Sequence, residues 1–182
     1  QGIKFGDQKF IDAMLVDGLT CAMEGCHMGL HAEHTAETDG VSRVDQDAFA
    51  ALSQQRAAAA QQQGAFTQEI EPVDGGKRVG MVEADEGIRA DTTAEGLSKL
   101  RPAFTKDGSV TAGNASTVND AAAFVLVGDR DALEAEGAKP RAKITDWVCV
   151  GVPPRIMGHG PVPASQKLVE KTGLSIGDID YC

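Results

Sequence analysis

Five residues able to act as nucleophiles or metal ligands lie close together near the start of the chain: Cys21, Cys26, His27, His31 and His34. On a continuous helix the three histidines would share one face, and three imidazoles with one water can complete the tetrahedral shell of a catalytic zinc. However, the adjacent residues Cys26 and His27 point apart on a helix, and no glutamate lies between paired histidines as in the HExxH zinc motif. A histidine-ligated metal module is therefore kept as an alternative, while our prediction is that the chain holds no metal.

The cysteines also raise the alternative of covalent chemistry. A thiolate of Cys21 or Cys26, activated by the imidazole of His31 or His159, would attack acyl carbonyls. Spacing alone does not bring these side chains into contact, and small buried cysteines with only a packing role are the more common case. The chain has four cysteines, too few and too unevenly spaced for a disulfide framework, so we expect reduced thiols in a cytoplasmic protein.

Other stretches are suited to binding rather than to bond making. The run TAGNAS at 111–116 offers backbone amides and hydroxyls to an extended ligand that contains amides. Arg89 lies between acidic segments and either forms a salt bridge or holds a phosphate in a bidentate manner. Glycines and prolines at 157–163 predict a tight turn that either approaches a ligand or is an ordinary connector. By residue type, Met28 and Phe104 are more often core residues than ligand contacts.

Apolar spacing and turn residues predict the elements that carry these side chains. Helical spacing predicts five helices, over residues 22–35, 42–63, 93–100, 129–137 and 164–172. The second of them begins with a capping-box-like Ser42–Asp45 pair. Alternating or apolar runs predict strands over 66–73, 77–81, 141–151 and 176–182, and a buried helix or strand over 119–128. Helices that alternate with strands favour an α/β or α+β architecture.

Composition excludes two classes of partner. There are 17 Lys and Arg against 27 Asp and Glu, a formal charge of -10, which repels a nucleic-acid backbone over most of the surface. No stretch approaches the roughly 20 consecutive apolar residues of a membrane-spanning helix. We therefore expect a soluble chain with no nucleic-acid or membrane partner. The apolar alternation at the C-terminal end leads us to expect an internal piece of a longer protein.

Seven short strings, in order and nearly end to end, resemble the thiolase family. They are DGLT at 17–20, HMG followed by HAE at 27–33, SRVDQDAF at 42–49, LRPAF at 100–104, VTAGNAS at 110–116, ND at 119–120 and MGHGPVPAS at 157–165. Thiolases are acyltransferases that cleave 3-ketoacyl-CoA with coenzyme A, or condense two acetyl-CoA molecules. The resemblance thus implies coenzyme A and acyl-CoA as partners, no cofactor, and a homodimer or homotetramer for the whole protein.

The family fold has two βαβαβαββ halves and an inserted loop domain that covers coenzyme A. The resemblance therefore implies a thiolase-like α/β fold, made here of an inserted α+β loop domain and incomplete pieces of the two halves. On this alignment 1–117 is the loop domain, 118–139 is the end of the N-terminal half and 140–182 is the start of the C-terminal half. The family's catalytic positions fall outside the chain, so the resemblance implies no catalytic residue within it.

The resemblance carries over nine residues that would contact coenzyme A or the acyl chain: Leu19, His27, Met28, Arg89, Phe104, Ala112, Ser116, Val118 and Met157. Of these, Arg89 matches the adenine and phosphate end, Ser116 would hydrogen-bond an amide of the pantetheine arm, and Met157 belongs to the loop over the acyl end.

The chain departs from the family at several of these places. Gly96 replaces a frequent nucleotide-contacting Ser, Thr117 and Val118 replace Gly-Leu, and His159 replaces a frequent Thr. These departures leave acyl-chain length open. A non-thiolytic acyl-CoA or lipid carrier of the same family is the nearest alternative, and a purely structural or interaction segment is another.

Overall fold

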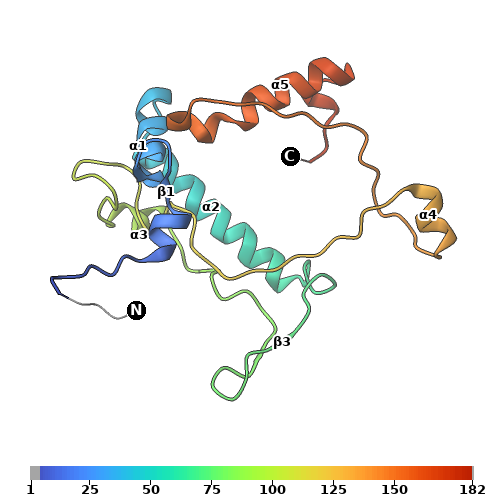
Figure 1. The fold of residues 1–182 in the computed structure, drawn as a ribbon, viewed down its shortest axis with the longest axis horizontal. Coiled ribbons are helices and arrows are strands. Elements are labelled where there is room, and N and C mark those ends of the chain that lie inside the picture. Colours follow the sequence, from blue (N-terminus) through green and yellow to red (C-terminus); the bar gives the residue numbers. More distant parts are fainter. Residues whose placement is uncertain (1–4, 182) are drawn as a thin grey trace. The chain divides into compact units, whose positions relative to one another are not determined.

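The computed structural model describes residues 5–181, which form two compact units that divide after Asn119 (Figure 1). In the first unit the elements are η1 (Met14–Gly18), β1 (Thr20–Cys21), β2 (Cys26–His27), α1 (Met28–Asp39), α2 (Arg43–Gln62), β3 (Val73–Asp74), β4 (Met81–Val82) and α3 (Ala94–Ser98). In the second they are α4 (Arg130–Ala135), η2 (Pro154–His159), α5 (Pro161–Thr172) and η3 (Ile176–Asp178).

The predicted long helix is present as α2, the main support of the first unit. Its N-cap is Ser42, whose Oγ accepts the backbone N–H of Asp45 at 3.2 Å, and the alanine-rich interior has high helix propensity. Buried Ala51 and Ala58 lie seven residues apart, so they mark one face of α2. Helix α3 packs against α2, and Leu97 of α3 belongs to the same small core.

The predicted helix over 22–35 is wrong in its first part. Residues 20–27 instead form a hairpin in which Cys21 pairs with Cys26 and Thr20 with His27. Gly25 has φ +64°, a left-handed conformation that glycine adopts without strain, and it allows the chain to reverse there. Helix α1 therefore begins only at Met28, and it ends at Gly40, which is also left-handed.

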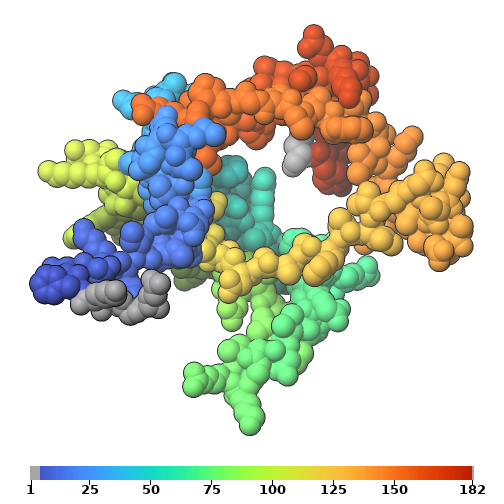
Figure 2. Space-filling view, in the orientation of Figure 1, coloured from blue at the N-terminus to red at the C-terminus, as the bar shows by residue number. Residues whose placement is uncertain are grey.

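Most of the predicted strands are wrong as well. Of 66–73, only Val73 enters a strand, in a short ladder of β3 with β4. Residues 119–128, predicted as a buried helix or strand, and the predicted strand 141–151 form no regular element, and 176–178 form a 3-10 turn instead of a strand. The side chain of Phe124 is 94% exposed, and Figure 2 shows the run before α4 as a single thickness of chain. A strand is held by backbone hydrogen bonds to a neighbouring strand, and within the described residues no strand pairs with these runs.

The predicted short helices are confirmed as α3, α4 and α5. Helix α5 lies against the extended run before it, because Lys171 donates to the Asp146 carboxylate and Lys167 Nζ donates to the carbonyl of Cys149 at 3.2 Å. None of the helices within residues 5–181 is both long and apolar enough to cross a bilayer.

Candidate functional site

The hairpin and the start of α1 bring together four of the nine residues expected from the sequence. The backbone N–H of Met28 donates to the carbonyl of Leu19 at 2.9 Å, which closes the hairpin. His27 caps α1, its Nδ1 accepting the N–H of Gly29 at 2.9 Å. The His27 ring lies 4.7 Å from the ring of Phe104, and a Cβ at Gly29 would collide with that same ring. Gly29 thus allows the aromatic pair to form directly above the helix start.

Phe104 is connected through the backbone to the turn that contains TAGNAS. Pro102 and Thr111 form an antiparallel bridge, and the N–H of Ala103 donates to the carbonyl of Val110 at 2.8 Å. Both Val110 and Thr111 are buried, so this short ladder is anchored in the core of the first unit. The aromatic pair and the turn are therefore parts of one rigid neighbourhood.

A buried carboxylate and a carboxamide hold the turn in place. The side chain of Asn114 accepts the N–H of Thr111 at 2.7 Å, and its Nδ2 donates to the carbonyl of Ser109 and to Oδ1 of Asp47, both at 3.0 Å. Asp47 is 2% exposed, and its Oδ2 accepts Nε of Arg43 at 2.7 Å. Because both oxygens of the buried carboxylate are paired, α2 supports the turn without an uncompensated charge.

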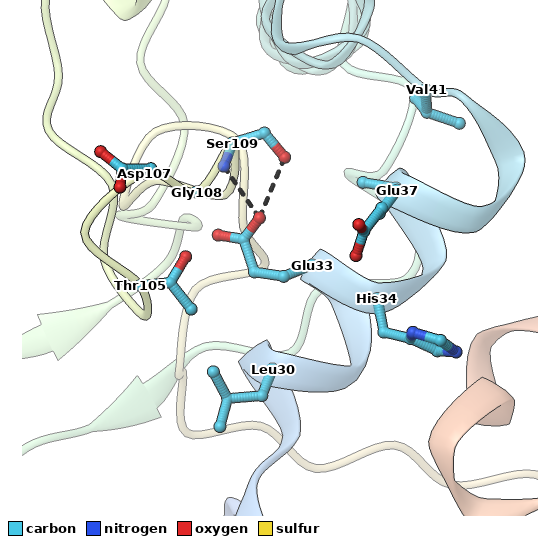
Figure 3. A pocket seen from close by; sticks show the side chains of 10 residues that line it. Leu30, Glu33, His34, Glu37, Val41, Thr105, Asp107, Gly108 and Ser109 are labelled. Carbon is cyan, nitrogen blue, oxygen red and sulfur yellow. Dashed lines mark hydrogen bonds between the residues drawn. The ribbon is translucent and has the colours of Figure 1, made fainter.

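A second carboxylate clamps the strand that leads into the turn. The side chain of Glu33, on α1, accepts the N–H of Ser109 at 2.8 Å, the hydroxyl of Ser109 at 3.1 Å and the N–H of Val110 at 3.0 Å. Figure 3 shows the Glu33 carboxylate directed at Ser109, while His34 on the same helix points away. Helices α1 and α2 thus each place one carboxylate on the 109–114 segment.

The pocket beside this clamp has a volume of about 580 Å³ (Figure 3). Its lining includes three acidic residues, Glu33, Glu37 and Asp107, and none of the nine residues expected to bind coenzyme A. Because the Glu37 and Asp107 carboxylates repel phosphate groups, the pocket is not suited to a nucleotide.

Three expected contact residues, Ala112, Ser116 and Val118, are exposed on or just after the turn. Arg89 is exposed too; its backbone N–H donates to Oε1 of Gln54 at 2.8 Å, which ties its loop to α2. Within residues 5–181, the guanidinium of Arg89 forms no ion pair. The salt bridge that the sequence left open is therefore not formed here, and this guanidinium remains available to an anion.

The ninth residue, Met157, lies on η2 in the second unit and is 48% exposed. Its place next to the other eight stays a prediction. In the same unit, the hydrogen bond from Lys171 holds the pKa of Asp146 below its ordinary value, with help from the N–H of Trp147. Hydrogen bonds from Ser175 likewise lower the pKa of Asp178. The Asp146–Lys171 pair lies at the C-terminal end of α5, and the Asp178–Ser175 pair caps η3.

The three histidines do not share a helix face. His27 is the N-cap of α1 and faces Phe104, whereas His31 is buried and His34 is partly exposed on the helix itself. The structure therefore contradicts the three-histidine zinc site, which the sequence left open as an alternative. His159, the other imidazole considered for a thiolate pair, lies in the second unit.

Sequence reasoning quoted the strings that contain Glu33, Asp47 and Asn114 but assigned these residues no role. Their contacts span 67 to 77 positions for the two carboxylates, so local spacing does not reveal them. One signal was available in the sequence. Glu33 and Asp47 both lie on predicted helices and within the short strings that resemble the family.

Two family models match the chain in succession. One is described as the N-terminal domain of thiolase and matches residues 1–131, and the other is described as the C-terminal domain of thiolase and matches residues 138–182. Curated relatives include the acetyl-CoA acetyltransferases of Shinella zoogloeoides and Escherichia coli, which are 50% and 48% identical over 181 residues. Each alignment covers 98% of this chain and 46% of the relative, so the chain spans about half the length of these relatives.

Solved structures agree. The acetyl-CoA acetyltransferase of Syntrophomonas wolfei superposes with a TM-score of 0.88 at 38% identity over 99% of this chain and 46% of its own. Human mitochondrial 3-ketoacyl-CoA thiolase in complex with CoA gives 0.85 at 37% identity, over 99% and 45%. The α/β fold class predicted from the sequence is thereby confirmed.

Proposed function

Because the chain belongs to the thiolase family, we propose that the protein carrying it transfers an acyl group between 3-ketoacyl-CoA, or acetyl-CoA, and coenzyme A. The observation that carries the proposal is that the two family models match successive parts of one chain. Relatives named acetyl-CoA acetyltransferase share about 50% sequence identity with it. In this proposal the described segment binds coenzyme A, as the human relative solved with CoA does.

The rigid neighbourhood around the turn supports binding of an extended ligand. Ala112, Ser116 and Val118 are exposed on a backbone that Asn114 and the buried Asp47 hold in place. A preorganised turn loses little conformational entropy when a flexible arm binds along it. In our proposal the hydroxyl of Ser116 pairs with an amide of the pantetheine arm.

Arg89 provides the contact for the phosphate end of the ligand. An exposed guanidinium without an ion pair can bind phosphate oxygens with two parallel N–H donors. The chain as a whole carries a charge of -10, so a local cation is needed where an anionic ligand is to bind. Apolar surface for the acyl end of the ligand comes from the aromatic pair of His27 and Phe104, together with Leu19 and Met28.

Bond making is assigned to residues outside the chain. We propose that a cysteine elsewhere in the protein forms the acyl-enzyme and that this segment converts binding energy from the nucleotide and arm into alignment of the thioester. We expect the isolated chain to be inactive, because exposed apolar runs such as 124–127 lack partners within the described residues. A cytoplasmic location, the absence of a cofactor, a homodimer or homotetramer and Met157 over the acyl end belong to this proposal as well.

The test is steady-state thiolysis of acetoacetyl-CoA by the protein in its natural length, with the KM for coenzyme A as the readout. We expect the Ser116→Ala variant to raise this KM about tenfold, since one lost hydrogen bond is worth about 1.4 kcal/mol, and to change kcat much less. Ser98→Ala is the matched control: the Ser98 hydroxyl is exposed on α3 and donates only to the carbonyl of Glu95 in its own helix.

Absence of thiolysis and of condensation in the natural-length protein would refute the proposed activity. If the protein is active but Ser116→Ala and Ser98→Ala give the same KM, the assignment of coenzyme A binding to this turn fails while the activity stands. Turnover by the 182-residue chain alone would refute the placement of the catalytic groups outside it.

A further inference from the structure

Three potential metal ligands converge where the β1–β2 hairpin meets α1. The Nε2 atom of His31 lies 3.3 Å from Sγ of Cys26 and 3.3 Å from a carboxylate oxygen of Glu24. The nitrogen, sulfur and oxygen all lie within 4.8 Å of one another. This is a different set from the three histidines considered from the sequence, and none of the nine residues of the candidate site belongs to it. We propose that Glu24, Cys26 and His31 bind a divalent cation of the zinc class.

The distances suit tetrahedral coordination. With Zn–S near 2.3 Å and Zn–N and Zn–O near 2.1 Å, tetrahedral angles place ligand atoms roughly 3.4–3.6 Å apart. The two distances of 3.3 Å from His31 Nε2 lie within tenths of an ångström of that range. The third distance, between Sγ of Cys26 and the Glu24 carboxylate oxygen, lies within 4.8 Å, so side-chain rotation brings these two atoms to the same range.

The arrangement does not suit a catalytic relay. In a thiol, imidazole and carboxylate relay, one ring nitrogen faces the nucleophile and the other faces the carboxylate. Here Cys26 and Glu24 both approach the same nitrogen, Nε2 of His31. The other ring nitrogen, Nδ1, is buried and has no partner among the described residues. Convergence on one nitrogen is the geometry of a shared cation rather than of proton transfer along a chain.

Hydrogen bonding alone leaves the cluster incompletely satisfied. A neutral imidazole has a single N–H, so Nε2 can donate to the sulfur or to the carboxylate but not fully to both. His31 is only 3% exposed, so water does not satisfy its ring nitrogens. A cation would interact with Nε2, the sulfur and the carboxylate oxygen at once, which a single N–H cannot do.

Charge and access also favour an ion. Binding of Zn²⁺ to Cys26 releases the thiol proton to solvent, and the resulting thiolate with the Glu24 carboxylate balances the two positive charges. The Glu24 side chain is 25% exposed, which leaves a solvent path and a fourth position for water. Sulfur with nitrogen and one carboxylate oxygen selects zinc over magnesium or calcium, which prefer all-oxygen shells.

The inferred role of the ion is to join the hairpin to the helix. Glu24 and Cys26 belong to the hairpin turn and β2, and His31 lies on the first turn of α1 after His27. An ion at this position restrains His27, whose ring faces Phe104 in the candidate coenzyme A site. The proposal does not depend on the acyl-transfer activity, because ion binding is measured on the purified protein without substrate.

The experiment titrates the natural-length protein, stripped with a chelator, with Zn²⁺ alone and follows heat and bound metal. We expect wild type to bind one zinc more per chain than Cys26→Ser, and we expect His31→Gln to lose the same equivalent. Each substitution should weaken this site at least about 100-fold, beyond the 10–100-fold typical of residues that only support ligands. The matched controls are Cys149→Ser, an exposed thiol of the second unit, and His34→Gln on the same helix; both should bind as wild type.

Cobalt supplies a second readout that does not depend on affinity. Co²⁺ bound to wild type should show a sulfur-to-cobalt charge-transfer absorption that is lost in Cys26→Ser and kept in Cys149→Ser, and circular dichroism should show equal helix content in all variants. Equal zinc stoichiometry and affinity in wild type and Cys26→Ser would overturn the proposal. A cobalt band that persists in Cys26→Ser would overturn it as well, because the sulfur ligand would then lie elsewhere.

Discussion

Removal of the Asn114 side chain tests whether hydrogen bonds to α2 stabilise the turn at 111–116. Asn114→Ala deletes three hydrogen bonds, to the N–H of Thr111 at 2.7 Å, the carbonyl of Ser109 at 3.0 Å and the carboxylate of Asp47 at 3.0 Å. A neutral bond contributes about 1 kcal/mol net and one to a charged group about 1.5 kcal/mol or more. Asp47 keeps its contact with Arg43, so we expect a loss of about 3 kcal/mol in the local stability of the turn.

Hydrogen exchange followed by mass spectrometry measures that loss in the natural-length protein. About 3 kcal/mol corresponds to exchange roughly 100-fold faster for amides of 109–116, since each 1.4 kcal/mol is a factor of ten. Asn119→Ala is the matched control: its Nδ2 donates only to Oγ1 of Thr117 at 2.9 Å in an exposed position, so the effect should stay within about 0.5 kcal/mol. If both variants accelerate exchange of the turn by less than threefold, the network does not hold the turn and our reasoning fails.

Two further substitutions probe other contacts. Gly29→Ala gains about 1 kcal/mol of helix propensity in α1, but its new Cβ collides with the ring of Phe104. We therefore expect lower thermal stability and a higher KM for coenzyme A. Gly18→Ala is the control, because a Cβ there meets no other atom, and it should change neither quantity. Asp146→Asn replaces the charged acceptor of Lys171 with a neutral amide oxygen. Because the pKa of Asp146 is lowered from 3.8, its contribution to the free energy of unfolding is full above that pH and is lost as the pH falls below it. The variant should therefore be slightly less stable than wild type near neutrality, and the difference should vanish in acid. Denaturant unfolding over a pH series measures this difference.

Local signals in the sequence predicted the elements that are stabilised locally. The N-cap at Ser42 and the alanine-rich run after it contain most of what α2 needs, and α2 begins and ends close to the predicted bounds. The short helices α3 and α4 also begin after capping side chains, Thr93 and Asp129. Helix α1 was predicted too early because the hairpin depends on a pairing of Cys21 with Cys26 and on the left-handed Gly25, neither of which alters the apolar spacing.

Strand predictions failed for a different physical reason. The apolar runs at 119–128 and 141–150 have strand composition, but a strand becomes an element only when a neighbour accepts and donates its backbone hydrogen bonds. No strand among the described residues pairs with either run, and Phe124, Val125 and Trp147 remain largely exposed. Composition thus predicts the strand propensity of these two runs, whereas strand formation also requires a neighbouring strand, which the local pattern of apolar residues does not specify.

The candidate site shows the same division between local and distant information. His27, Met28 and Leu19 are close in sequence, and the structure joins them through the hairpin. The support for the turn comes instead from Glu33 and Asp47, whose hydrogen bonds to it span more than sixty residues. No periodicity or spacing rule connects positions that far apart.

Net charge, likewise, does not determine the sign of the potential at a site. The excess of acidic residues argues against binding of a nucleic-acid backbone over most of the surface. Near the turn, however, both oxygens of Asp47 are paired within the fold, and so are both oxygens of Glu33. Each of these carboxylates is engaged by donors of the turn or of α2, which offsets its field near the bound segment. The exposed Arg89 guanidinium has no such partner among the described residues. A chain of charge -10 can therefore present an exposed guanidinium without an ion pair among the described residues, because the Asp47 and Glu33 carboxylates are already paired within the fold.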